Sequence, residues 1–371
     1  MRSALFRGQT RHTESLTSLS RGEPVRDYSA FTQLTPEALA EAFSHAPTPR
    51  VISLLPAATE IVTMLGAESM VVGITHECDY PAHIARTRPH VTGTPISATL
   101  TTSAWSPGSA AAIDAQVREL AHQGASLFHL DVGRITSLAP TVFLTQALCD
   151  VCAVDERDVR SIAASLQPPP TVVTLDGTTV EGVFRDIQTV ANALGLSSDG
   201  EELVDGLRVR LRRVRERLAS ANAAADAGAG VAGQPTRPLP RVAVVEWSEP
   251  VYAAGHWVPE LVAYAGGVDV LAEPGKHSTV RAVEEIAAAK PDVLFIAPCG
   301  YSVAQAADEA ADLLAHPEWA WARQLPVWAL DANGLMTRPG PRIVDGVETL
   351  ASALYPEVFD PPNPSKAKRI I

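Results

Sequence analysis

Short apolar runs alternate with polar loops and amphipathic stretches along most of the chain. Runs of strand length occupy residues 51–55, 71–74, 142–145, 172–175, 242–245, 293–296 and 327–330. Apolar positions with helical spacing lie between them, as in residues 56–65 and 114–122. Strands that alternate with helices in this way predict parallel sheets with crossover helices, and hence an α/β fold.

Polar and aromatic side chains directly follow most of these strand-like runs. The carboxyl ends of the strands form the ligand crevice in open α/β sheets, so these side chains predict one binding cleft fed from both halves of the chain. The candidate ligand-binding residues are His76, Glu77, Cys78, Tyr80, Gln146, Cys149, Glu246, Trp247, Tyr252, His256, Trp257 and Arg338.

An amphipathic segment separates the two halves. Apolar residues recur at helical spacing from Thr179 to Leu194. About 16 residues at about 1.5 Å each would form a helix about 24 Å long, enough to link two lobes. The expected organisation is a mostly disordered tail with a short helix (1–49), lobe I (50–178), a bridging helix (179–197), lobe II (198–356) with a flexible Ala/Gly/Pro loop near 221–240, and a C-terminal tail (357–371).

A short internal repeat supports two lobes of similar design. Residues 60–66 read EIVTMLG and residues 260–266 read ELVAYAG. Both segments follow a strand and a loop, and both read as the first helix of a lobe that ends at a glycine.

Composition describes a globular chain. Hydrophobic residues make up 46% of the 371 residues, charged residues make up 19%, and the net charge is −12. The negative charge argues against nucleic acid as a partner, and no apolar run reaches the roughly 18 residues of a membrane span. The first 21 residues contain Arg2, Arg7, Arg11 and Arg21 and lack the apolar stretch of a secretory signal. A cytoplasmic location is therefore expected, with organelle targeting as the alternative.

Thiols and imidazoles suggest a metal. Cys149 and Cys152 have CxxC spacing, and with Cys78 and His256 they are the candidate metal ligands. Thiolate with imidazole suits zinc, copper(I) or iron, and the cobalt of a corrinoid accepts such axial ligands. The alternative is that these cysteines are small, partly buried and inert.

Three aromatic residues and two arginines add to the candidate site. Trp247, Tyr252 and Trp257 could cover a planar macrocycle, although Trp257 could equally be a core residue. Arg338 could bind a carboxylate or phosphate, whereas Arg342 is expected to anchor its turn to Asp345 or Glu348.

Several motifs resemble a known family. Residues 50–60 (RVISLLPAATE), 79–81 (DYP), 290–293 (KPDV) and 338–342 (RPGPR) are similar to class III periplasmic-binding-protein-like sequences, the cobalamin-binding type above all. The resemblance covers about residues 50–355. It implies two Rossmann-like α/β lobes joined by a single long helix, the class III substrate-binding-protein fold, with the ligand between the lobes.

The same resemblance implies a function and some departures from it. Such proteins bind vitamin B12, iron–siderophore complexes or haem for ABC importers, with Tyr252 and Arg338 at ligand-facing positions. Residues 275–278 (GKHS) lack the tryptophan of lobe II, and Glu77 replaces an aromatic residue. The glutamate that docks each lobe onto a permease is present as Glu284 in lobe II, while lobe I has Gly133.

The sequence thus predicts a protein that holds a metal macrocycle or chelate between its lobes. Cobalamin or another corrinoid is the first candidate ligand, and haem or a ferric chelate is the next. The expected role is an intracellular carrier, scavenger or sensor. The alternative is a thiol- or metal-dependent enzyme acting on a corrinoid, with Glu246 as a general base or Cys149 and His76 as a nucleophile pair.

Overall fold

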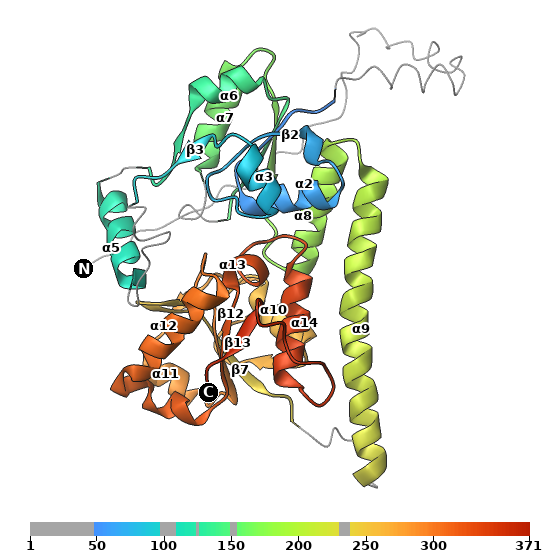
Figure 1. The fold of residues 1–371 in the computed structure, drawn as a ribbon, viewed down its shortest axis with the longest axis vertical. Coiled ribbons are helices and arrows are strands. Elements are labelled where there is room, and N and C mark those ends of the chain that lie inside the picture. Colours follow the sequence, from blue (N-terminus) through green and yellow to red (C-terminus); the bar gives the residue numbers. More distant parts are fainter. Residues whose placement is uncertain (1–47, 97–108, 124–125, 149–153, 230–237) are drawn as a thin grey trace, which may run out of the picture. The chain divides into compact units, whose positions relative to one another are not determined.

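The computed structural model describes residues 48–96, 109–123, 126–148, 154–229 and 238–371. The chain divides into two compact units, Met1–Thr48 and Pro49–Ile371. All helices and strands of the described residues lie in the second unit (Figure 1). The disordered tail predicted for residues 1–49 falls almost entirely outside the described residues.

Lobe I contains a four-stranded parallel sheet with the order β2-β1-β5-β6. Its strands are β1 (Val51–Ser53), β2 (Val71–Ile74), β5 (Val142–Gln146) and β6 (Thr171–Leu175). A separate pair is formed by β3 (Thr92–Gly93) and β4 (His129–Leu130). The helices are α2 (Pro56–Met64), η2 (Glu68–Met70), α3 (Ala82–Thr87), α5 (Ser109–His122), α6 (Val132–Leu138) and α7 (Glu156–Ser165). All residues of β1 and β5 are buried, as expected for strands covered on both faces.

Lobe II contains a mixed sheet with the order β10-β8-β7-β11-β12-β13, and β9 pairs with β7. Its strands are β7 (Arg241–Ser248), β8 (Val251–Ala253), β9 (Val268–Asp269), β10 (Thr279–Val280), β11 (Val293–Ile296), β12 (Val327–Leu330) and β13 (Ala367–Arg369). The central strands β7, β11 and β12 are parallel. The helices are α10 (Val258–Tyr264), α11 (Val283–Ala288), α12 (Val303–Ala315), η3 (Pro317–Gln324), α13 (Ala332–Leu335) and α14 (Ile343–Leu354).

The C-terminal segment differs from the expected tail. β13 pairs antiparallel with β12 and adds an edge strand to the lobe II sheet. Ala367 is buried in the main core, and the amide of Ile370 donates to the carbonyl of Val327. These contacts join residues far apart in sequence, so the local composition of the segment does not reveal them.

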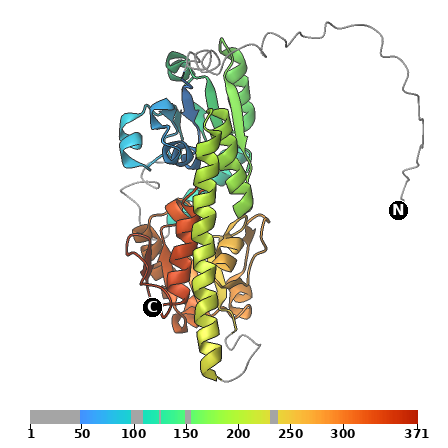
Figure 2. The ribbon, with the colours of Figure 1, turned by 90° about the vertical axis from the view of Figure 1, so that its right-hand side faces the viewer.

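The connection between the lobes consists of two helices. α8 (Val180–Ala193) packs on β6 and α2 of lobe I, and α9 (Ser197–Ala229) packs along α8 and then along α14 and α10 of lobe II (Figure 2). With 33 residues, α9 is about 50 Å long. It continues through Ala229 into the stretch expected to be a flexible loop, because alanine is the strongest helix former. The predicted lobe boundaries themselves stay a prediction.

The internal repeat corresponds to equivalent elements. α2 and α10 each start with a proline in the first turn and are followed by a glycine with positive φ, 72° at Gly66 and 85° at Gly266. α6 and α11 are likewise each followed by a residue with positive φ, Ala139 and Lys290, and then by a proline. Two α/β lobes of similar plan are therefore present, as predicted.

Apolar side chains of α2, α8, α9, α10 and α14 belong to one continuous core that reaches from one lobe to the other. Within the described ranges, no helix combines the length and the apolar composition that a membrane crossing requires.

Candidate functional site

A cleft of about 270 Å³ lies between the strand ends of the two sheets. Gln146 is the last residue of β5, Trp247 is the second-to-last residue of β7, and Tyr301 follows β11. The cleft is therefore at the position expected for an α/β crevice. Its lining residues are Leu55, Pro56, Ala57, Glu77, Thr94, Ile96, Ile113, Val117, Phe128, Gln146, Trp247, Cys299, Gly300, Tyr301, Gln305, Asn333, Thr337, Arg338 and Pro339.

Apolar and aromatic side chains from both lobes form the walls. Phe128 comes from lobe I, and Trp247 and Tyr301 come from lobe II. The rings of Trp247 and Tyr301 meet edge to face with centroids 5.8 Å apart. Such an arrangement presents flat apolar surface and fixes the orientation of both rings.

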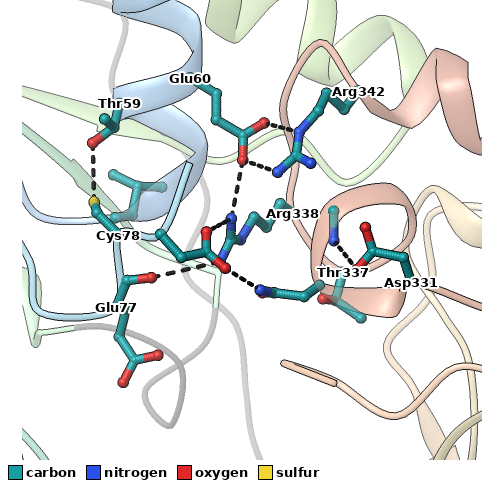
Figure 3. Close-up of polar contacts among 12 residues, drawn as sticks. Thr59, Glu60, Glu77, Cys78, Asp331, Thr337, Arg338 and Arg342 are labelled. Carbon is teal, nitrogen blue, oxygen red and sulfur yellow. Dashed lines mark hydrogen bonds and ion pairs between the residues drawn. The ribbon is translucent and has the colours of Figure 1, made fainter. Parts of the chain in front are cut away.

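An ionic cluster joins the lobes beside the cleft (Figure 3). Glu60 of α2 is fully buried, and its two oxygens accept three hydrogen bonds. Arg342 donates to Glu60 from Nε at 2.7 Å and from Nη2 at 2.5 Å, and Arg338 donates from Nη1 at 3.1 Å. These three hydrogen bonds from charged donors offset the free-energy cost of removing the carboxylate from water.

Asp79 is the second acid of the cluster. Its Oδ1 accepts from Arg338 Nη1 at 2.5 Å, and its Oδ2 accepts from Asn333 Nδ2 at 2.5 Å. Burial acts to lower the pKa of Arg338, but the hydrogen bonds and charges of Asp79 and Glu60 outweigh burial and raise that pKa. Arg338 is thus fully charged and already paired with two acids.

Arg342 does not bind the acids expected from its local sequence. Asp345 and Glu348 instead accept from Arg210 of α9, which lies against α14. Arg342 points to the other lobe, where it binds Glu60 and lies 4.1 Å from the ring of Tyr80. The expectation fails because helix packing, not sequence proximity, decides the partner.

Four of the predicted ligand-binding residues line the cleft: Glu77, Gln146, Trp247 and Arg338. They come from both lobes, as the strand-end pattern indicates. Their role in ligand binding stays a prediction.

Three predicted residues of lobe I lie beside the cleft. His76 Nδ1 is 2.6 Å from Thr92 Oγ1, and the imidazole is 5.7 Å from the ring of Phe128. Cys78 is buried, and its sulfur is 3.0 Å from Thr59 Oγ1 (Figure 3). Tyr80 is 44% exposed and covers Arg342. None of these three residues is among the lining residues of the cleft.

Four predicted residues of lobe II also lie outside the cleft lining. Trp257 is a core residue, and its indole Nε1 donates to the carbonyl of Met336 at 2.7 Å. Glu246 accepts from Ser278 Oγ at 2.7 Å, and burial raises its pKa against the effect of that hydrogen bond. Tyr252 pairs with Trp247 across β7 and β8.

His256 has a different neighbour. Its Nε2 is 3.2 Å from His277 Nδ1, and burial together with His277 lowers the pKa of His256. One ring nitrogen of each imidazole therefore already contacts the other ring.

The candidate metal ligands are only partly described. Cys149 and Cys152 lie outside the described residues. Burial raises the pKa of the Cys78 thiol to about 12, so this thiol is protonated at neutral pH in the metal-free chain. In the parts of the chain that the structure describes, no group of three or more His, Cys, Asp or Glu side chains is arranged to hold a metal ion.

Other lining residues were not among the predicted ones. Phe128 precedes β4, Tyr301 follows β11, and Asn333 follows β12. The strand-end rule that identified Gln146 and Trp247 could have identified Tyr301 and Asn333 as well. Phe128 carries no such signal, because it precedes its strand.

Comparisons with known proteins define the class. The family model for periplasmic binding protein matches residues 129–322, more than half of the chain. The chain belongs to the periplasmic binding protein family. This membership confirms the predicted fold class and the prediction of a binding protein rather than an enzyme.

Particular relatives are more distant. The vitamin B12-binding protein of Vibrio cholerae serotype O1 is 24% identical over 332 residues, covering 87% of this chain and 94% of the relative. A periplasmic heme binding protein from Pseudomonas aeruginosa aligns with a TM-score of 0.61 at 20% identity, covering 86% of this chain and 97% of that chain. The periplasmic vitamin B12 binding protein BtuF of Vibrio cholerae aligns with a TM-score of 0.55 at 20% identity, covering 83% and 97%.

The expected cytoplasmic location is wrong, and so is the organelle alternative. The relatives are periplasmic binding proteins, which indicates a periplasmic or other extracytoplasmic location. The prediction depended on the composition of the first 21 residues, which lie outside the residues that the family model matches.

Proposed function

We propose that this protein binds a corrinoid of the cobalamin type in the cleft between its lobes. The observation that carries the proposal is the chemistry of the cleft lining, which combines aromatic walls from both lobes with neutral amide side chains. Pockets that orient a ligand typically have this mixture of apolar surface and a few polar groups.

The polar groups favour an amide-bearing macrocycle. A corrin ring carries carboxamide side chains, and Gln146, Gln305 and Asn333 bring neutral amides, which can donate to and accept from another amide, to the cleft. Within the protein, Gln305 Oε1 accepts from Ser302, and Asn333 Nδ2 donates to Asp79. Haem carries two carboxylates, and many ferric chelates are anionic. Among the described residues that line the cleft, Arg338 alone has a guanidinium or ammonium group, and it is paired with Glu60 and Asp79. The cleft therefore offers little to an anion.

The similarity to a vitamin B12-binding protein and to heme-binding proteins supports a ligand of this size and shape. The cleft volume of about 270 Å³ is slightly below the usual range for ligand pockets, about 300–1,000 Å³. We infer that part of a corrinoid remains outside the cleft.

Titration of the purified chain with cyanocobalamin, haemin and a ferric chelate tests the proposal. Calorimetry and absorption spectra are expected to show tight binding of one cyanocobalamin per chain and weaker binding of the other two. If none of the three ligands binds, the proposal fails. If haemin binds more tightly than cyanocobalamin, the second candidate ligand replaces the first.

Two tryptophan variants locate the site. Trp247→Ala is expected to weaken cyanocobalamin binding by about tenfold or more, because it removes a wall of the cleft. Trp257→Phe is the matched control, since Trp257 lies in the core and its loss should lower stability but leave the affinity nearly unchanged. The opposite result would place the ligand elsewhere.

We further propose that the protein delivers its ligand to an ABC permease. Glu284 is exposed in the first turn of α11 in lobe II, and Gly133 is exposed in the first turn of the equivalent helix α6 in lobe I. One lobe thus offers a carboxylate and the other does not. Glu284→Ala should reduce capture of the permease from solubilised membranes of the source organism, and Gly133→Glu should increase it. Equal capture by all three chains would contradict this docking mode.

A further inference from the structure

Asp79 is a lobe I carboxylate held by lobe II. It lies in the turn after β2, and its two oxygens bind Arg338 Nη1 and Asn333 Nδ2, each at 2.5 Å. Both donors belong to side chains that line the cleft. Each Asp79 oxygen therefore occupies a donor that a carboxylate group of a ligand would otherwise bind.

The two acids of the cluster differ in their accessibility. The Glu60 side chain is fully buried and is bound by Arg338 and Arg342, so a ligand cannot replace it. The Asp79 side chain is 53% exposed. The Asp79 position is therefore open to solvent and is bound by two side chains that line the cleft, whereas the Glu60 position is closed.

We propose that Asp79 is a specificity-determining residue that excludes carboxylate-bearing macrocycles from the cleft. This inference rests on the proposed corrinoid function. Asp79 acts as a built-in carboxylate at the Arg338 and Asn333 donors, so a ligand carboxylate has to displace it and then lie beside it. A ligand carboxamide has no such conflict, because its N–H can donate to a carboxylate.

Neighbouring charges act in the same direction. Glu77 lines the cleft with a second carboxylate, and Asp331 interacts electrostatically with Asp79. Like charges at such short range are unfavourable in a site with restricted solvent. Near Arg338, the acids outnumber the cations, and Arg338 itself is already paired with two of these acids. A ligand anion would therefore be repelled there.

Cyanocobalamin and its monocarboxylate derivatives form a matched set of probes. They have the same size and shape, and each derivative has one ring carboxamide replaced by a carboxylate. Competition between the amide and each separate isomer in one sample gives a ratio of dissociation constants that does not depend on the fraction of folded protein. The wild-type chain is expected to prefer the amide over at least one isomer by about tenfold or more.

Asp79→Ala is expected to reduce this preference to about twofold or to reverse it, because Asn333 Nδ2 loses its acceptor and Arg338 Nη1 keeps Glu60 but loses Asp79. Asp79→Asn provides a second variant that keeps the size of the side chain. Glu77→Gln is the charge-matched comparison: it removes a carboxylate of the cleft whose partner is His76 Nε2, at 3.1 Å, and leaves the Asp79 contacts with Arg338 and Asn333 in place, so the ratio should change less than in the Asp79 variants.

Each result has a defined meaning. If the wild-type chain binds no corrinoid, the proposed function fails. If the wild-type chain binds corrinoids but does not distinguish the amide from any carboxylate isomer, the role of Asp79 is overturned. The role is also overturned if both Asp79 variants keep the wild-type ratio, since a purely structural Asp79 would alter both affinities equally, or if Glu77→Gln changes the ratio as much as they do.

Discussion

Glu60 and Glu260 occupy the same position in equivalent helices of the two lobes, but their surroundings differ. Glu60 of α2 is fully buried and binds Arg338 and Arg342 of the other lobe. Glu260 of α10 is half-buried, and its Oε2 accepts from the backbone amide of Val180 at 2.6 Å, at the start of α8. One acid is part of a buried ionic cluster, while the other caps a helix.

This comparison separates what the repeat determines from what it does not. The shared pattern in residues 60–66 and 260–266 determines a helix and its glycine end in both lobes. The partner of the glutamate depends on which element packs against that helix. The two glutamates should therefore differ strongly in their contribution to stability.

Glu60→Gln is expected to have the largest effect. It leaves Arg338 and Arg342 with less negative charge in a buried site, and breaking such a cluster typically costs about 3–5 kcal/mol of the free energy of unfolding. Urea unfolding measures this loss. Glu68→Gln, at an exposed acid paired with His83, is the control and should change the stability by less than about 1 kcal/mol. A loss at Glu60 as small as that of the control would contradict the comparison.

Alanine substitutions at Gly66 and Gly266, the glycines that follow α2 and α10, should cause the next largest losses of stability. An alanine at either position has an unfavourable left-handed backbone, which costs about 1–2 kcal/mol. The added Cβ at Gly66 would meet no atom within 4 Å, whereas at Gly266 it would lie 2.8 Å from Leu218 Cδ1 and 3.0 Å from Tyr355 Cε2. Overpacking should therefore make Gly266→Ala more destabilising than Gly66→Ala by about 1–3 kcal/mol. Equal losses in urea unfolding would show that lobe II relaxes around the new methyl group.

The fold could be predicted because its signals are local. The apolar runs that became β5 and β11 are fully buried strands, and the spacing from Thr179 to Leu194 is that of α8. The edge strand β13 gave no signal, since its pairing with β12 is a contact between distant segments.

The site could be predicted only in part, for a related reason. Gln146 and Trp247 lie at the ends of their strands, so the strand-end rule places them in the cleft. Trp257 follows a loop and begins α10, where its ring turns into the core. Arg342 binds Glu60 across 282 positions of the chain, and no local pattern indicates such a partner.

Two aspartates should make stability depend on pH, one in the helix α8 between the lobes and one in lobe II. Burial raises the pKa of Asp186 in α8 and of Asp269 in β9 to about 6, against the opposing hydrogen bonds from backbone amides. Because these folded-state values lie above the ordinary value of 3.8, the stabilising contribution is complete below about pH 4 and is lost as the pH rises through 6.

Asp186→Asn removes this titration. Relative to the wild-type chain, the variant should therefore gain stability as the pH rises from about 4.5 to about 7.5, by about 2 kcal/mol. Urea unfolding at both pH values measures the gain, and Asp269→Asn in lobe II should show a similar gain. A stability difference between variant and wild type that is the same at both pH values would mean that the aspartate titrates normally.

Glu260→Gln should have the smallest effect. The glutamine can still accept from the amide of Val180, but it lacks the negative charge that stabilises the start of α8. Thr179 continues to cap the helix by accepting from the amide of Gly182 at 3.0 Å. The expected loss is therefore only about 0.5–1 kcal/mol in urea unfolding. Thr179→Ala removes the other cap of the same turn and should cost about 1 kcal/mol. If Glu260→Gln instead destabilises the chain as much as Glu60→Gln, the two equivalent glutamates have equivalent roles, and packing context does not distinguish them.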